Sequence, residues 1–209
     1  MLHFTTDHLK TFERFYRANL VNGISGFKPA ALIGTKSGNG VSNLAIFSSV
    51  VHLGADPALI GFIQRPVGVS GDTYRNIRET GYYTINHVEE SVVDRAHYTS
   101  ARFGAGVSEF EACGFTEEYL GDFFAPFVRE SPIRIGLRFA EEFHIRRNDT
   151  RLIIGEILHL TLPEECLLPD GNVDLNRAGV VSVSGLAYYH KPARLGEFPY
   201  AKVSKVPEF

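Results

Sequence analysis

Residues 30–51 read AALIGTKSGNGVSNLAIFSSVV, and this stretch decides the fold. It opens with a short apolar run at residues 30–35 and closes with a second extended run at residues 41–51. Between the two runs lies Lys36-Ser37-Gly38-Asn39-Gly40, a cluster of turn-forming residues. Two β-type runs joined by a short glycine-containing turn are typical of a hairpin. The stretch therefore predicts two antiparallel strands.

The residues that follow add alternating strands and short helices. Asp56-Pro57 predicts a turn and residues 58–63 a third strand. Residues 72–81 predict a short helix, with Asp72 as its N-cap and Gly81 as its C-terminal cap. Residues 82–86 are rich in β-forming side chains, and residues 91–98 predict a further helix.

The second half of the chain returns to strands after a long irregular excursion at residues 99–130, which can include helical turns. Residues 133–139 and 152–162 predict strands, with a turn at Arg147-Asn148-Asp149, and residues 169–183 are mostly loop. Hairpins dominate, and no strand–helix–strand rhythm repeats. The pattern therefore favours a mainly β fold, an antiparallel barrel with flanking helices.

An amphipathic helix is expected at the start of the chain, at about residues 7–20. Leu9, Phe12, Tyr16 and Leu20 recur at spacings of three and four, with charged residues between them. Either Thr6 or Asp7 can cap its start. A length of 209 residues fits a single domain that spans residues 1–209.

Composition and charge exclude several classes of function. The chain carries 21 Lys and Arg against 24 Asp and Glu, a net charge of −3, and has no basic stripe, so no nucleic-acid partner is expected. No apolar run reaches the roughly 18 residues of a membrane span. The first residues lack the pattern of a signal peptide. Cys113 and Cys166 stand far apart, which predicts reduced thiols and a cytoplasmic protein.

Common catalytic motifs do not occur in the sequence. It has no P-loop, no Gly-x-Ser-x-Gly and no His-Glu-x-x-His. Gly38-Asn39-Gly40 lies in a hairpin turn and lacks the third glycine and the following helix of a dinucleotide-binding fingerprint. No two of the eight histidines are three or four residues apart, so the sequence favours no metal site.

Two segments carry polar chemistry that needs an explanation. Residues 42–49 place amide and hydroxyl groups in an otherwise apolar strand, which at its simplest is a strand with one polar face. Arg65-Pro66 is followed by Ser70-Gly71-Asp72-Thr73, where a cation, hydroxyls and a helix N-terminus could bind a phosphate. A plain capped helix is the alternative, because the Asp72 carboxylate repels an anion unless it is turned away as the cap.

The chain also resembles the flavin reductase-like, FMN-binding split-barrel family, which includes the flavoredoxins. The resemblance runs from about residue 28 to residue 189. Its segments occur in the family's order: residues 29–35, Asn43-Leu44-Ala45-Ile46-Phe47-Ser48 for the family's Asn-Leu-Ala-Pro-Phe-Ser, and residues 56–62, 72–77, 81–86, 130–132, 152–157 and 185–189. The resemblance implies a split β-barrel with its core at about residues 28–189.

The same resemblance implies an FMN site at a homodimer interface. In the family, the Asn-Leu-Ala strand passes the isoalloxazine ring, partly through backbone groups, and Asn43, Leu44 and Ala45 inherit that role. The phosphate ligands by resemblance are Ser48, Ser49 and Thr73, with Arg65 as the cation. The remaining candidates for cofactor binding are Phe47, Ser100, Tyr188 and Tyr189, and Tyr188 or Tyr189 is expected near the ring.

Two positions depart from the family pattern. Ile46 stands where the family commonly has proline, and Thr150 stands where many reductases have a histidine near the nicotinamide.

The implied activity is hydride transfer from NADH or NADPH to the flavin, followed by electron delivery to an acceptor. The cofactor carries this chemistry, so no catalytic side chain is expected. An FMN-bound electron carrier that uses no pyridine nucleotide is the alternative that Thr150 favours, and a flavin-binding module without turnover is a third. The acceptor and the choice between NADH and NADPH stay open.

Overall fold

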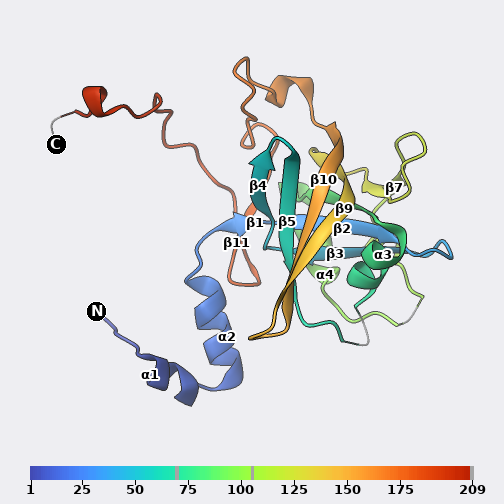
Figure 1. Cartoon of the computed structure of the whole chain (residues 1–209), viewed down its shortest axis with the longest axis horizontal. Helices are drawn as coiled ribbons and strands as arrows, with labels where there is room; N and C mark the ends of the chain where they lie inside the picture. Colours follow the sequence, from blue (N-terminus) through green and yellow to red (C-terminus); the bar gives the residue numbers. More distant parts are fainter. Residues whose placement is uncertain (69–70, 105, 208–209) are drawn as a thin grey trace.

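The computed structural model describes residues 1–68, 71–104 and 106–207. Its centre is a seven-stranded sheet, antiparallel throughout, in the order β3-β2-β6-β9-β10-β5-β4 (Figure 1). Its strands are β2 Ala31–Lys36, β3 Ser42–Phe47, β4 Val51–Ala55, β5 Ala58–Gln64, β6 Tyr82–His87, β9 Arg134–Ile145 and β10 Thr150–Thr161. The expected mainly β, antiparallel architecture is confirmed.

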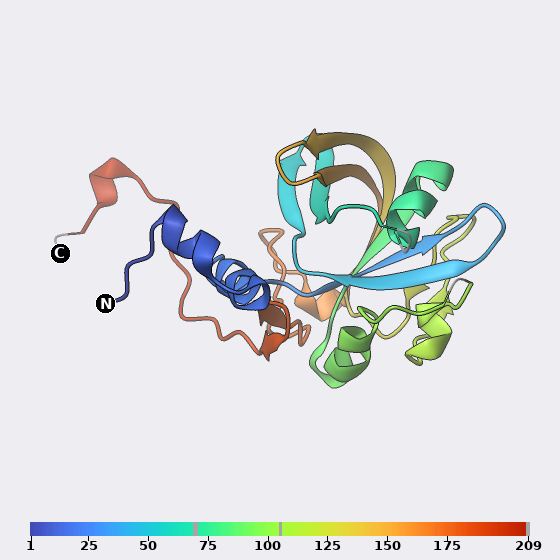
Figure 2. The ribbon, with the colours of Figure 1, turned by 90° about the horizontal axis from the view of Figure 1, so that it is seen from below.

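The two end strands of this sheet, β3 and β4, follow one another in the chain. Residues 48–50 therefore bring both edges of the sheet to one corner, and the sheet curls into a barrel that is split beyond it (Figure 2). Within this barrel, β2 and β3 pair from Ala31 opposite Phe47 to Lys36 opposite Ser42, which confirms the first predicted hairpin. Its second extended stretch, expected to reach residue 51, ends at Phe47, because the chain turns at residues 48–50 into β4. The other predicted hairpin, β9–β10, is longer than the sequence indicated.

Two apolar clusters lie on the two faces of the sheet, as the alternation of side chains along a strand requires. The barrel interior holds Ala31, Ile33, Phe62, Ile77, Tyr83, Ile85, Ile135, Leu137 and Ile153. The outer cluster lies between the sheet and the helices that follow β6, and it holds Ala30, Leu32, Leu44, Val88, Val92, Ala96, Phe110, Cys113, Phe115, Val128, Val181 and Val183.

The flanking helices are α3 Asp72–Thr80, the 3₁₀ turn η1 Glu90–Val92, α4 Val93–Tyr98 and α5 Glu109–Ala112. Gly81 adopts a left-handed conformation with φ 78°, which confirms the predicted C-terminal cap of α3. The predicted N-cap was wrong. Gly71 holds that position, and Asp72 is the first helical residue, where its carboxylate pairs with Arg75.

Smaller elements complete the described part of the chain. β1 Lys28–Pro29, β11 Ser182–Ser184 and β12 Tyr188–His190 form a second sheet, and β7 Glu117–Glu118 pairs with β8 Phe127–Val128. The 3₁₀ turns η2 and η3 span Glu164–Cys166 and Val203–Lys205. Cys113 and Cys166 are both free and buried.

The single N-terminal helix expected at residues 7–20 is in fact two helices, α1 Thr6–Thr11 and α2 Arg14–Gly23. The chain becomes extended at Phe12, where ψ is 144°, because Glu13 caps the second helix by accepting the N–H groups of Phe15 and Tyr16. The cap of α1 is Thr5 rather than Thr6 or Asp7. Periodicity alone does not reveal such a break, since the apolar positions keep their spacing across it.

No helix within residues 1–68, 71–104 and 106–207 combines the length and the apolar character needed to cross a membrane.

Candidate functional site

The side chains of β3 alternate between the two faces of the sheet. Phe47 packs inside the barrel with its ring 5.0 Å from that of Phe62. Leu44 and Ile46 face the outer cluster, and Leu44 is completely buried there. The Leu44 side chain therefore belongs to the core, so the role beside a flavin ring that the resemblance implies is left to backbone groups.

The outer edge of β3 is covered at its start. The N–H of Leu44 donates to Glu109 Oε2 at 3.1 Å, and the Ser42 hydroxyl bonds to Ser108 Oγ at 2.7 Å and to the Glu117 carboxylate. Burial raises the pKa of Glu109, while the hydrogen bond from Leu44 acts in the opposite direction. The short α5 segment thus blocks the first half of an otherwise exposed strand edge.

Near the C-terminal end of β3, the outer edge of the strand is not covered by another described segment. Residues of an antiparallel pair alternate between facing the partner strand and facing away, so Ile46, two residues after Leu44, directs its N–H and C=O to the outer edge. Among the described residues nothing bonds to them. A strand tolerates proline where its N–H faces outward, so the family's proline at this position agrees with that geometry.

The corner after β3 is tied to the end of β5. Ser49 Oγ accepts the N–H of Ile63 at 3.1 Å and donates to its carbonyl at 3.2 Å. Its hydroxyl proton is therefore in use within the fold. The Ser48 hydroxyl, next to it, has no partner among the described residues.

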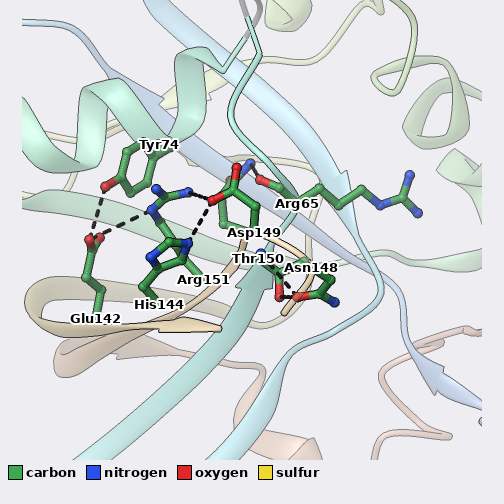
Figure 3. A network of polar contacts seen from close by, with 9 residues as sticks. Arg65, Tyr74, Glu142, His144, Asn148, Asp149, Thr150 and Arg151 are labelled. Carbon is green, nitrogen blue, oxygen red and sulfur yellow. Dashed lines mark hydrogen bonds and ion pairs between the residues drawn. The ribbon is translucent and has the colours of Figure 1, made fainter. Parts of the chain in front are cut away.

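Arg65 follows directly after β5, two residues beyond Ile63. Strand geometry puts it about 7 Å from the level of Ser49, within reach of an arginine side chain. The guanidinium is exposed and meets no carboxylate in the described ranges, and Figure 3 shows it directed away from the neighbouring acidic side chains. Ser48 and Arg65 thus give the corner an available hydroxyl and an available positive charge.

Thr73 lies elsewhere. Asn43 Nδ2 donates to Thr73 Oγ1 at 3.0 Å, and Asn76 Nδ2 donates to Thr35 Oγ1 at 3.0 Å, with all four residues buried. These two bonds fix α3 to β2 and β3. Ser48 follows Asn43 by five residues, or about 16 Å of extended strand. The described contacts thus put the predicted phosphate ligands in two groups, with Thr73 bonded at the start of β3 and Ser48 after its end. Ser70 lies outside the described residues.

Thr150 begins β10, on the strand beside Arg65. Its hydroxyl donates to Asn148 Oδ1 at 2.8 Å, which stabilises the hairpin turn (Figure 3). Arg151, opposite Gln64 in the ladder, forms an ion pair with Asp149 at 3.6 Å. His144 Nε2 lies 2.7 Å from the same Asp149 carboxylate. An imidazole is therefore present on the hairpin, but it is paired with a carboxylate.

The network in Figure 3 also ties this hairpin to α3. Tyr74 Oη donates to Glu142 Oε1 at 3.1 Å, and the Arg151 guanidinium lies 5.3 Å from the centre of the Tyr74 ring. Burial, together with the Glu142 carboxylate, raises the pKa of Tyr74. The hairpin end is thereby held beside the helix.

The remaining candidates gather at α4. Tyr189 Oη lies 3.1 Å from His97 Nδ1, and Ser100 Oγ donates to the His97 carbonyl at 2.7 Å. Burial raises the pKa of Tyr189, which packs with Ile46 against the outer cluster, whereas Tyr188 is exposed. The sequence analysis missed His97, because a lone histidine on a short helix carries no motif.

A family model, described as the flavin reductase like domain, matches residues 27–191. The chain belongs to this flavin reductase-like family. The match covers most of the chain and agrees with the resemblance at residues 28–189.

Solved structures of similar proteins support the membership. A split-barrel protein from Shewanella frigidimarina, named as a flavin reductase, is 45% identical with a TM-score of 0.93 and covers 96% of this chain and 100% of its own. The flavoredoxin of Desulfovibrio vulgaris is 26% identical with a TM-score of 0.70, over 86% of this chain and 92% of its own.

A protein of uncharacterised function from Halalkalibacterium halodurans is 31% identical over 161 residues, which cover 74% of this chain and 77% of that protein. For this flavin reductase-like chain, the comparisons therefore identify family and fold. The site has to be argued from the residues described above.

Proposed function

We propose that this protein binds FMN and accepts a hydride from NADH or NADPH, then passes the electrons to an acceptor. The observation that supports the proposal is the corner between β3 and β5. Ser48 follows the open strand edge at Ile46 by two residues, and the exposed Arg65 follows Ile63, the residue to which Ser49 is bonded. A cation and a hydroxyl without protein partners suit a phosphate. A free N–H and C=O pair suits the amide edge of a flavin.

FMN fits these residues because they offer hydrogen-bonding and charged groups that have no partner among the described residues. Arg65 and Ser48 would hold the phosphate, while Ser49 holds the corner in shape through its two bonds to Ile63. Ile46 would offer one donor and one acceptor to the ring. Bound flavin supplies the hydride-accepting chemistry, and the chain supplies position and electrostatics.

In this proposal, most of the other candidate residues hold the site in shape and do not contact the phosphate. Asn43 and Thr73 hold α3 against the sheet, and Phe47 packs the barrel beneath the site. Ala45 lies next to Ile46 on the strand whose backbone would contact the ring. Tyr189 and Ser100 position His97 on α4, and Tyr188 lies exposed at the end of β12, open to a ligand.

We also propose a homodimer in a reducing compartment such as the cytoplasm. The free, buried cysteines agree with such a compartment, where thiols stay reduced. The dimer follows from the family resemblance, which implies an FMN site at a dimer interface.

A second function is favoured by one specific observation. Thr150 stands where many reductases have a histidine, and its hydroxyl bonds within its own turn. An FMN-bound electron carrier, reduced by a protein partner, needs no nicotinamide site there. The likeness to a flavoredoxin agrees with this alternative.

Anaerobic reduction of the purified, FMN-loaded protein separates these functions. Bleaching of the yellow colour by NADH or NADPH is the result expected of a reductase. Colour that resists both nucleotides and bleaches with dithionite supports the carrier. A protein that takes up no FMN contradicts both.

A further inference from the structure

The C-terminal segment beyond Arg194 leaves the barrel without covering any of it. Its base is held by the Arg194–Asp174 ion pair at 3.4 Å and the Lys191–Glu90 ion pair at 2.6 Å. Beyond Arg194, no described residue bonds to the barrel, and the chain runs outward (Figure 1). Yet the segment is apolar, with exposed fractions of 100% at Leu195, 88% at Phe198 and 94% at Val203.

The N-terminal helices are likewise apolar and exposed. Neither α1 nor α2 has a buried residue, while Phe15, Ile24 and Phe27 are about 70% exposed. Figures 1 and 2 show these helices and the C-terminal segment on the same side of the barrel. Monomeric proteins seldom expose apolar surface on this scale. We call residues 1–27 and 191–207 the projecting segments.

A solved relative shows that this arrangement is not peculiar to one chain. The superposition on the Shewanella protein covers 96% of this chain, which leaves only about eight residues outside it, fewer than either projecting segment has. The relative therefore shares most of their course. Among the described residues, residues 1–21 and 195–207 make no hydrogen bond or ion pair to their own barrel, so these parts need another surface to hold them there.

We propose that the projecting segments clasp the barrel of a second copy of this chain, an inference that rests on the proposed homodimer. Area supports it, because the exposed aromatic side chains Phe15, Tyr16, Phe27, Phe198 and Tyr200, at about 150–250 Å² each, offer roughly the 800 Å² per partner of a stable interface. In a two-fold dimer each copy donates its segments and receives those of the other.

Charge supports the same partner. Residues 1–27 and 191–207 together carry seven Lys and Arg against three Asp and Glu, whereas residues 28–190 carry 14 against 20. The segments are thus net positive and the barrel net negative, so each is complementary to the other in a second copy. The barrel also carries exposed apolar side chains, Leu53 on β4 and Phe143 on β9, and Phe143 lies opposite Leu152 in the β9–β10 ladder.

Light scattering tests the inference on the full chain and two variants. The full chain should have twice its monomer mass of 23.2 kDa at micromolar concentration. Truncation after Arg194, and separately the triple change Leu195→Ser, Phe198→Ser and Tyr200→Ser, should weaken dimerisation at least 100-fold. The triple variant changes only exposed side chains, so folding of the barrel is not at risk. Glu197→Gln with Lys202→Gln, on the same segment, is the matched control and should stay dimeric.

Trypsin provides a second readout, because cleavage after Lys202 should be slow in the dimer and fast after dilution to monomers. A full chain that is dimeric and whose truncated form dimerises equally well overturns the role of the segments but keeps the homodimer. A monomeric full chain with rapid cleavage at Lys202 overturns both. Neither result touches the flavin chemistry, which the bleaching experiment measures separately.

Discussion

The polar groups at the two ends of β3 differ in whether the protein itself provides their hydrogen-bond partners. At its start, the Asn43 side-chain amide donates to the Thr73 hydroxyl, and the Leu44 N–H donates to the Glu109 carboxylate. At its end, the backbone of Ile46 and the hydroxyl of Ser48 have no partner among the described residues, and the nearby corner of β5 ends in the exposed Arg65, which meets no carboxylate there. Polar groups that already have partners stabilise the fold, and those left without partners are available to a ligand. The closed end is therefore structural, and the open end is where a phosphate should bind.

The largest expected effect separates FMN from riboflavin. If the open end holds the phosphate, riboflavin forfeits at least two charge-assisted hydrogen bonds, each worth about 1.5–3 kcal/mol. Its dissociation constant should exceed that of FMN by roughly 100-fold or more. Fluorescence quenching on titration of the apoprotein measures both. Equal dissociation constants for FMN and riboflavin would show that the protein does not bind the phosphate.

Arg65→Gln tests the open end directly. Loss of the guanidinium should weaken FMN binding by about 1.5–3 kcal/mol, or roughly 10- to 150-fold, and leave riboflavin binding unchanged. Arg65→Lys is the matched control, since it keeps the charge and should recover most of the affinity. A variant that loses affinity for both flavins alike would place Arg65 beside the ring instead.

Thr73→Ala tests the closed end. The buried amide of Asn43 then loses its acceptor, which should lower the free energy of unfolding by about 1–3 kcal/mol, while FMN affinity changes by less than about twofold. Urea denaturation of the apoprotein measures the first quantity. Thr73→Ser keeps the hydroxyl and should recover most of the loss. A stable variant with poor FMN affinity would return Thr73 to the phosphate site.

Two adjacent serines sharpen the comparison within one corner. Ser49→Ala removes both bonds to Ile63 and should cost about 1 kcal/mol of stability. Ser48→Ala removes a hydroxyl without protein partners, so it should leave stability within about 0.5 kcal/mol and weaken FMN binding by up to about tenfold. Denaturation and titration of both variants check this. The reverse pattern would exchange the roles of the two serines.

The sequence predicted the barrel because its signals are local. The hairpin at residues 30–51 and the helix that ends at Gly81 follow from alternation and turn chemistry, which neighbouring residues decide. The resemblance added the family and the extent of its domain. The break between α1 and α2 escaped, because Glu13 acts as a cap without disturbing the apolar spacing.

The site was harder to predict. A residue can bind a ligand only if the fold leaves its polar group without a hydrogen-bond partner, and the sequence does not show this. Ser48, Ser49 and Thr73 carry the same hydroxyl, and nothing in the sequence shows that two of the three are already bonded. That Ile46 offers its backbone, whereas Leu44 does not, depends on α5, more than sixty residues away. Such long-range pairings are decided by tertiary packing.

Glu109→Gln gives the smallest expected effect, and it tests how the closed half of the β3 edge is held. Burial raises the pKa of Glu109 above its ordinary value of 4.5, so the folded protein holds this proton more tightly than the unfolded chain. The carboxyl's contribution to stability is therefore complete below pH 4.5 and is lost as the pH rises through the folded-state pKa. Glutamine keeps an oxygen for the Leu44 N–H and has no proton to lose.

The variant should thus lose that part of the pH dependence and melt higher than the wild type at pH 8, by no more than about 2–4 °C. His87, whose pKa is lowered by burial from 6.5, costs stability as the pH falls below that value, but it does so in both proteins. The difference between their melting curves across pH isolates Glu109, and Glu111→Gln on the same helix should produce no such difference. If Glu109→Gln melts lower than the wild type at pH 8, the ionised carboxylate itself holds the edge closed, through the charge it places on the Leu44 N–H.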